Sequence, residues 1–385
     1  MRDASVWDLM VVGAGPAGAA AALEARRLRQ DAAVLLVDKA AFPRDKPCGD
    51  GIGPHAVDEL AALGATAVLV GYPPIHGLRL RSPRGLEVAG IPARPNHVVP
   101  RAVLDARLVD AALAAGASFR QARVRRLEQR GGLVVADGEL AARVVVGADG
   151  ANSAVRRQLG ATPNPDRALA IAVRGYAPAP AGPPEQLIAW VAEGWPAYVW
   201  SFPTGTGVAN VGYGLLRSRF AGGKAELHRR LRDLLPEADP DPASLRAHHL
   251  PFSSSRPPPG RGRLLLAGDA ASLVNPLSGE GIYYALASGR LAARAALLAP
   301  DRPADAYRRL LAGALGRHLR HATVLAYAIR SPALAEAGLA ASATSPALFD
   351  VLVELGLGQA RITPRLLAAL PGGLLRSRRL TRGTG

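Results

Sequence analysis

The segment from Asp8 to Ala40, DLMVVGAGPAGAAAALEARRLRQDAAVLLVDKA, constrains the fold more than any other part of the chain. An apolar run ends at a GxGxxG pattern made by Gly13, Gly15 and Gly18, and an Ala-rich helical stretch that includes Ala17 follows. In such a pattern the first glycine allows a tight turn, the second a close approach of backbone to a pyrophosphate, and the third close packing of helix on sheet. The pattern predicts a Rossmann-like α/β fold with a dinucleotide pyrophosphate at the helix N-terminus.

A second apolar run follows this helix and closes at Asp38 and Lys39. Asp38 comes 20 residues after Gly18, the place where a carboxylate accepts hydrogen bonds from ribose hydroxyls. We therefore assign Asp38 and Lys39 to the cofactor site. An acid here disfavours a 2′-phosphate but serves NAD and FAD equally, so this motif leaves the choice of dinucleotide open.

Two later motifs also follow predicted strands. The first, AARVVVGADGANSAVRRQLG, contains Asp149 before a polar turn. The second, GRLLLAGDAASLVNPLSGEGIYYALASG, contains Asp269 and then Gly279, Gly281 and Ile282 at the start of a long helix. Asp269 at a strand end can accept a hydrogen bond from a ribityl hydroxyl, and N–H groups at a helix start can stabilise negative charge on a reduced flavin ring.

The three motifs in this order resemble the FAD-dependent oxidoreductases of the para-hydroxybenzoate hydroxylase superfamily. The resemblance spans most of the chain and implies FAD as the cofactor, a glutathione-reductase-type FAD-binding domain, and Asp149, Asp269, Gly279, Gly281 and Ile282 as FAD-binding residues.

An arginine near the flavin is a further feature of this superfamily, and Arg101 in VVPRAVLDARL matches it. A surface arginine at a helix start is the alternative interpretation of Arg101.

Two further segments resemble the geranylgeranyl reductase family, whose members saturate isoprenoid double bonds. FPRDKPCGDGI matches a loop of that family and contains Cys48, the only cysteine of the chain, followed by Gly49. PAYVWSFP resembles its PxxYxWxFP pattern, with one residue instead of two between Pro196 and Tyr198. The aromatic hydroxylases of the superfamily usually have His after GDAA, whereas this chain has Ser272, which counts against a phenol hydroxylase.

The alternating rings of Tyr198, Trp200 and Phe202 share one face if the segment is a strand. Large rings suit a branched, apolar prenyl chain, because small-molecule sites are lined mainly by apolar groups. We assign these three residues and Pro203 to substrate binding, with Trp190 and Trp195 nearby in the sequence. A sheet face that packs on the protein's own core is the alternative.

The predicted reaction is hydride transfer from reduced FAD to a prenyl double bond, together with protonation of the less substituted carbon. We assign Cys48, Tyr198 and Trp200 to catalysis. The thiol is mostly protonated at neutral pH, but it is a poor acid for an alkene, so flavin positioning or proton relay is an equal possibility for Cys48. Asp50, Tyr198 and a flavin-bound water compete as proton donors.

The expected substrate is a prenylated lipid, a prenyl diphosphate, a quinone such as menaquinone, or another hydrophobic small molecule. The electron donor is NAD(P)H, ferredoxin or a separate reductase, since no second dinucleotide-binding fold is predicted. A monooxygenase or halogenase-like tailoring enzyme of secondary metabolism, and a protein that uses FAD without net electron transfer, are the alternative functions.

The three cofactor motifs are far apart in the sequence, so the domain built on them is discontinuous. The FAD-binding domain is expected to comprise residues 1–75, 97–165 and 260–300. Residues 76–96 and 166–259 contain alternating segments between Pro- and Gly-rich loops, which predict an antiparallel-sheet substrate domain. Residues 301–385 are predicted to be mainly helical.

The formal net charge is +16, but lysine occurs only at positions 39, 46 and 224, and no DNA-reading motif is present. We therefore expect no nucleic-acid partner. The histidines form no metal-ligand pattern, and no metal is predicted.

Because the sequence shows no signal peptide, no membrane-spanning run and one cysteine, a cytoplasmic location is expected. The C-terminal LLAALPGGLLRSRRLTRGTG mixes Leu with Arg and predicts either a capping helix or peripheral membrane contact.

Overall fold

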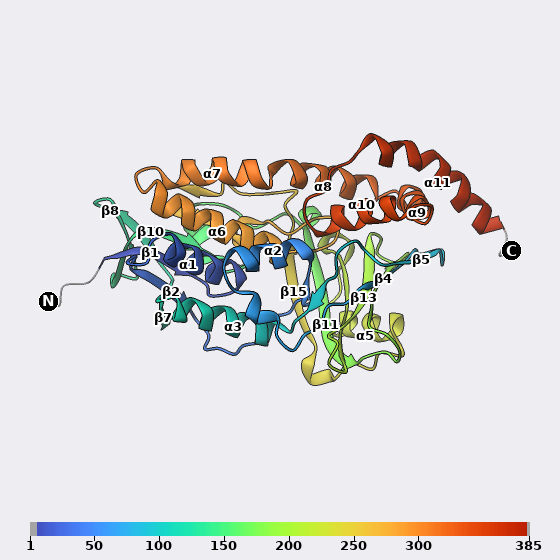
Figure 1. The fold of residues 1–385 in the computed structure, drawn as a ribbon, viewed down its shortest axis with the longest axis horizontal. Coiled ribbons are helices and arrows are strands. Elements are labelled where there is room, and N and C mark those ends of the chain that lie inside the picture. The colour runs from blue at the N-terminus through green and yellow to red at the C-terminus, as the bar shows by residue number, and fades with distance from the viewer. Residues whose placement is uncertain (1–5, 383–385) are drawn as a thin grey trace.

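The computed structural model describes residues 6–382, with side chains described as far as residue 376. The molecule is elongated, with the first strands at one end and the last helices at the other (Figure 1). Two large sheets and a set of C-terminal helices make up a mixed α/β structure. This arrangement confirms the expected fold class: a Rossmann-like FAD-binding fold, an antiparallel sheet and C-terminal helices.

The first sheet carries the Gly-rich motif. Its strands are β1 (Trp7–Val12), β2 (Val34–Asp38), β7 (Ser118–Gln121), β8 (Leu127–Arg130), β9 (Leu133–Ala136), β10 (Leu140–Gly147), β16 (Gly260–Arg261) and β17 (Leu264–Leu266). The order β16-β17-β10-β1-β2-β7 contains parallel neighbours from β17 to β7, and β8 and β9 pair beside β10. Strand β2 is buried along its whole length, as is usual where helices cover a parallel sheet.

Two helices pack closely over this sheet, α1 (Pro16–Leu28) and α6 (Ile282–Leu298), as Figure 1 shows. A Cβ atom at Gly289 would lie 2.0 Å from the carbonyl oxygen of Ala17, so only glycine permits this approach. The start of α1 therefore packs against the middle of α6. The other helices of this region are α2 (Pro54–Ala62), α3 (Arg101–Ala114) and α4 (Ala154–Gln158).

The second sheet has strands from two parts of the chain. They are β4 (Gly77–Arg81), β5 (Glu87–Gly90), β11 (Leu169–Pro178), β12 (Glu185–Val191), β13 (Ala197–Pro203), β14 (Val208–Leu216) and β15 (Arg246–Pro251). In the order β15-β11-β14-β13-β12-β4-β5, all neighbours are antiparallel except β12 and β4. One face packs on α5 (Lys224–Leu234) through Val199, Tyr213, Leu227 and Leu231. A two-stranded ribbon, β3 (Gly51–Ile52) with β6 (His97–Val98), is separate from both sheets.

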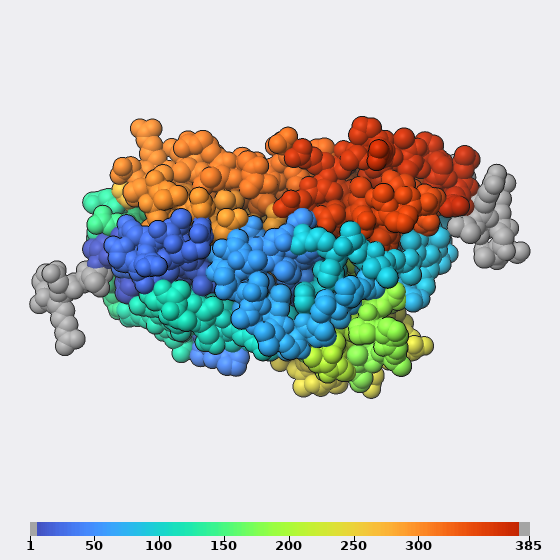
Figure 2. Space-filling model, viewed as in Figure 1, coloured from blue at the N-terminus to red at the C-terminus, as the bar shows by residue number. Residues whose placement is uncertain are grey.

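The C-terminal helices form a layer along the second sheet and α6. They are α7 (Pro303–Ala314), α8 (Gly316–Ala328), α9 (Pro332–Ser342), α10 (Pro346–Leu357) and α11 (Pro364–Arg382). Phe349 and Val353 of α10 pack on Leu78 and Val88 of the second sheet. Figure 2 shows these helices, coloured orange and red, as one continuous surface above the blue and cyan parts of the chain. The domain limits given above stay a prediction.

Candidate active site

A cavity of about 830 Å³ lies where the first sheet, the second sheet, α10 and the starts of α1, α3 and α6 meet. It brings together most residues assigned to the site from the sequence. These are Gly13, Gly15, Ala17, Asp38, Lys39, Cys48, Gly49, Arg101, Asp149, Tyr198, Trp200, Phe202, Asp269, Gly279, Gly281 and Ile282. Gly18 packs on the backbone of Gly13, and Pro203 is buried at the end of β13, so neither lines the cavity.

The dinucleotide end of the cavity is shaped by glycines. Gly13 has φ 99°, and a Cβ atom there would lie 2.4 Å from the carbonyl oxygen of Ala148. A Cβ atom at Gly18 would lie 1.8 Å from the carbonyl oxygen of Gly13, so the helix can sit close to the turn only with glycine here. No side chain caps the start of α1 and its first turn has no acid, which leaves N–H groups for an anion. These features fit the pyrophosphate of FAD.

Carboxylates hold the turns around this end. Asp38 Oδ2 accepts a hydrogen bond from the N–H of Ala14 at 2.9 Å, and Oδ1 accepts one from Ala40. Asp149 Oδ2 accepts from the N–H of Ala154 at 2.6 Å, at the start of α4. Burial raises the pKa of Asp149, although the hydrogen bonds to its carboxylate lower that pKa in part. Both carboxylates order the backbone that lines the cavity, and their contact with FAD stays a prediction.

Arg101 lies inside this site and not on the surface, with 4% of the residue exposed. Its guanidinium donates to both carboxylate oxygens of Asp105, at 2.7 and 2.8 Å, and Arg44 pairs with the same carboxylate at 3.1 Å. A Cβ atom at Gly15 would have Arg44 and Arg101 as its nearest neighbours, at 3.5 and 3.6 Å. Two cations therefore flank the glycine at which the pyrophosphate is expected.

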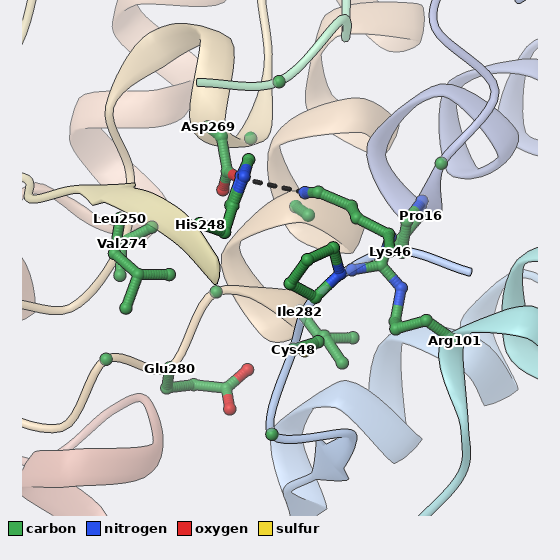
Figure 3. A pocket seen from close by; sticks show the side chains of 18 of the residues that line it. Pro16, Lys46, Cys48, Arg101, His248, Leu250, Asp269, Val274, Glu280 and Ile282 are labelled. Carbon is green, nitrogen blue, oxygen red and sulfur yellow. Dashed lines mark hydrogen bonds and ion pairs between the residues drawn. The ribbon is translucent and has the colours of Figure 1, made fainter. Parts of the chain in front are cut away.

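Lys46 and Asp269 form an ion pair across the cavity, at 3.1 Å (Figure 3). Burial disfavours the charged carboxylate, but Lys46 and His248 outweigh burial and lower the pKa of Asp269. Burial, with Lys46 next in importance, lowers the pKa of His248 to about 4. At neutral pH the site therefore holds a carboxylate, an ammonium and a neutral imidazole close together.

The segment around Cys48 is fixed by a buried hydrogen-bond network. Asn210 Nδ2 donates to the carbonyl oxygen of Cys48 and to Asp50 Oδ2, both at 2.8 Å. Tyr176 donates to the same Asp50 oxygen at 2.6 Å, and Asp50 has φ 61°. Burial raises the pKa of Cys48, although the Arg101 guanidinium lowers it in part. The thiol is therefore protonated at neutral pH.

The rings of Tyr198, Trp200 and Phe202 form one aromatic wall of the cavity. Their centroids lie 5.7 Å apart from Tyr198 to Trp200, and 6.4 Å apart from Trp200 to Phe202. A Cβ atom at Gly49 would lie 3.5 Å from Phe202 and 3.6 Å from Trp200 Nε1, so the Cys48 segment lies against this wall. The wall faces the cavity, while the opposite face of the same strand packs on α5.

The tryptophan cluster seen in the sequence divides in the structure. Trp190 lines the cavity with Trp200. Trp195 instead donates from Nε1 to the carbonyl oxygens of Ile329 and Arg330, after α8. Proximity in sequence placed Trp195 near the pocket, but it lies in the loop before β13 and points to the C-terminal helices.

The sequence reasoning did not select three polar groups of this site: Asn210, Tyr176 and Glu280. Asn210 also accepts a hydrogen bond from Trp200 Nε1 at 2.8 Å, which orients the ring. An amide within the otherwise apolar run VANVGYGLL is the signal that could have identified Asn210. Glu280 lies within the helix-start motif, in which only the flanking Gly279, Gly281 and Ile282 were predicted to bind the cofactor.

No helix in the described part of the chain is long and apolar enough to cross a membrane. Among residues 6–382, no three His, Cys, Asp or Glu side chains form a group able to hold a metal ion.

Comparison with known proteins agrees with this architecture. Residues 7–294 match the family model described as "FAD binding domain". The fold and the site thus define an FAD-dependent oxidoreductase. A geranylgeranyl bacteriochlorophyll reductase-like protein from Thermoplasma acidophilum has the same fold, with a TM-score of 0.77, 21% identity, and 98% and 99% of the two chains covered. A flavin-dependent brominase is also similar, with a TM-score of 0.63, 20% identity, and 91% and 98% covered.

Curated relatives are more similar in sequence. A menaquinone reductase of Mycobacterium tuberculosis is 35% identical over 90% of each chain. A digeranylgeranylglycerophospholipid reductase of Methanopyrus kandleri is 33% identical over 75% of this chain and 76% of its own. The chain belongs to the geranylgeranyl reductase family of FAD-dependent oxidoreductases.

Proposed function

We propose that this protein saturates a carbon–carbon double bond in the prenyl chain of a lipoquinone, with menaquinone as the first candidate. The observation that carries the proposal is the aromatic wall of Tyr198, Trp200 and Phe202 against the Cys48 segment, in the same cavity as the FAD-binding motifs. The relatives named menaquinone reductase support the choice of lipid.

The chain's own residues would bind and orient both molecules. The start of α1, with Arg44 and Arg101, would hold the pyrophosphate of FAD, and bound reduced FAD would supply the hydride. The rings of Trp200 and Phe202 would bind the prenyl chain and exclude water from it. Asn210 accepts a hydrogen bond from Trp200 and donates one to the Cys48 carbonyl oxygen, so the wall and the thiol would keep a constant position relative to the double bond.

The decisive experiment is a single turnover without oxygen. Dithionite-reduced holoenzyme is mixed with menaquinone, and the lipid is analysed by mass spectrometry for a gain of two hydrogens in the side chain. We expect that gain together with reoxidation of the flavin. No side-chain gain under anaerobic conditions, with an oxygenated product in air, would overturn the proposal in favour of a monooxygenase.

Two variations of this experiment define the substrate and the donor. Digeranylgeranylglycerophospholipid replaces menaquinone in one arm, and faster reduction of this lipid would contradict the choice of a quinone. NADH, NADPH or reduced ferredoxin replaces dithionite in the other arm, and flavin bleaching identifies the donor.

We also propose that α11 contacts an anionic membrane surface, because a lipid substrate resides there. Leu367 and Leu375 of α11 are 56% and 64% exposed, and the nearby Arg365 and Arg376 are exposed as well. Exposed leucines beside arginines favour a helix that lies on anionic lipid. The end of the basic tail, residues 383–385, lies outside the described residues.

Flotation with anionic and neutral vesicles tests this contact, with full-length protein compared with a version ending at Pro371. We expect only the full-length protein to float, and only with anionic vesicles. Equal flotation of both forms, or of neither, would rule out a role of the tail.

A further inference from the structure

The carboxyl group of Glu280 enters the cavity from the loop before α6, on the side facing Cys48 (Figure 3). The loop is rigidly held: the Glu280 N–H donates to Ser278 Oγ at 3.2 Å, and its carbonyl oxygen accepts from Asn275 at 2.8 Å. Oε1 of the side chain accepts from the N–H of Tyr283 at 2.8 Å. The residue is half-buried, so the carboxyl is fixed on one side and accessible from the cavity on the other.

The loop that carries Glu280 is in contact with the aromatic wall. Tyr198 donates from its hydroxyl to the carbonyl oxygen of Ser278 at 3.1 Å. A Cβ atom at Gly279 would lie 2.7 Å from the same hydroxyl oxygen, which explains why glycine precedes Glu280. A prenyl chain that lies along the rings would therefore pass close to the Glu280 carboxyl.

The other candidate acids of the cavity are less suitable. Burial raises the pKa of Cys48, and it raises the pKa of Tyr198 to about 12, so both groups are weaker acids than usual. Asp50 is 0% exposed, and its Oδ2 already accepts from Tyr176 and Asn210. Although Asp50 borders the cavity, its carboxyl is not exposed there as the Glu280 carboxyl is.

Glu280 combines access with a suitable acidity. Burial raises the pKa of Glu280 to about 7, although backbone hydrogen bonds from Tyr283 and Ile282 favour the charged carboxylate. A substantial fraction of the Glu280 side chains is then protonated at neutral pH. A general acid works best when its pKa is near the working pH. The titratable groups that interact with it are the hydroxyls of Tyr198 on β13 and Tyr284 on α6.

We propose that Glu280 is the catalytic acid that protonates the prenyl double bond, a role that rests on the proposed reductase function. The O–H bond of the carboxylic acid breaks, and the π electrons of the alkene form a C–H bond at the less substituted carbon. The more substituted carbon becomes electron-poor and would accept a hydride, the chemistry that reduced FAD would supply when bound, with oxidation of the flavin as the balancing change. The Glu280 carboxylate then takes a proton from water, and the alkene has gained two hydrogens.

Glu280→Gln tests the role, because an amide oxygen can still accept from Tyr283 but the side chain cannot donate a proton as an acid. In anaerobic single turnovers with menaquinone, we expect the rate to fall on the order of 10²-fold or more, with unchanged flavin content. The wild-type rate should fall as pH rises through about 7, and E280Q should show no such fall. Glu280→Asp should restore part of the rate and of the pH dependence.

Glu336→Gln is the matched control, because it makes the same change at a glutamate of α9 that is buried outside the cavity lining. We expect wild-type turnover in E336Q. Infrared spectroscopy, with the spectrum of each variant compared with that of wild type, provides a readout that does not depend on turnover. At about pH 6, the carbonyl band of a protonated carboxylic acid should be present in wild type and E336Q and reduced in E280Q.

The possible outcomes distinguish failure of the proposed reductase function from failure of the role assigned to Glu280. Wild-type protein that leaves menaquinone unreduced overturns the proposed function and this role with it. Reduction by wild type and E280Q at equal rates, or an infrared band unaffected by E280Q, overturns the role of Glu280 alone. If both E280Q and E280D lose FAD, Glu280 is needed for cofactor binding and its assignment as the acid is wrong.

Discussion

Lys46 Nζ lies 3.1 Å from Asp269 Oδ2, although the two residues are 223 positions apart in the chain. The lysine belongs to the Cys48 segment and the carboxylate to the short 3₁₀ helix Gly268–Ala271 that follows β17. Because both are largely buried, the ion pair fastens the Cys48 segment across the cavity to the motif before α6.

Removing the lysine should destabilise the protein in a pH-dependent way. We expect Lys46→Met to lower the free energy of unfolding by about 2 kcal/mol at neutral pH. The folded-state pKa of Asp269 is lowered, so the contribution of the pair is present above the unfolded pKa of about 4 and is lost as pH falls through the folded pKa. Urea unfolding at neutral and acidic pH measures this. Lys224→Met, at the exposed start of α5, is the control, and an equal loss in that variant would contradict the prediction.

Cys48 is predicted to position the reacting groups. Cys48→Ala and Cys48→Ser should keep FAD, measured by flavin absorbance per protein. Both should slow anaerobic prenyl reduction on the order of 10²-fold, the scale expected when reacting groups are slightly misplaced. Wild-type turnover in either variant would remove Cys48 from the mechanism.

The aromatic wall can be tested by adding one methyl group. Gly212 pairs with Trp200 across β14 and β13, and a Cβ atom there would lie 2.1 Å from the Trp200 ring. Gly212→Ala should therefore displace the ring, lower the free energy of unfolding by about 1–3 kcal/mol and slow prenyl reduction. Gly214→Ala on the same strand is the matched control, since its nearest contacts would be 3.5 Å or longer. Similar rates of prenyl reduction in the two variants would argue against the wall as the prenyl site.

Asp50 should make the protein less stable as pH rises. Burial raises its pKa to about 6, above the unfolded value of about 4, so the folded state binds the proton more tightly. Stability should fall as pH rises from about 4 to about 6. Asp50→Asn should remove this contribution to the decrease in the free energy of unfolding. The stability of the variant relative to wild type should therefore rise over that pH range, which urea unfolding measures. Asp301→Asn, at an exposed turn, should follow wild type; a constant difference between D50N and wild type across pH would refute the prediction.

Much of the fold and cofactor site could be predicted because the signals are local. Gly13, Gly15 and Gly18 form a recognisable spacing within a few residues, although the contact that excludes a Cβ atom at Gly13 comes from Ala148. The parallel sheet, α1 and α6 likewise follow from contiguous patterns. The parallel pairing of β4 with β12 could not be predicted in this way, because alternation shows which face a residue takes and not which strand lies beside it.

The sequence by itself determined the FAD-binding motifs, the family and the aromatic stripe, since each is written in consecutive residues. Only the tertiary structure decided that Lys46 meets Asp269, that Asn210 holds both Trp200 and the Cys48 backbone, and that Glu280 lines the same cavity as Cys48. Those properties depend on burial and on contacts between distant segments. Burial and distant contacts set the pKa of a carboxyl group, and a linear sequence contains neither.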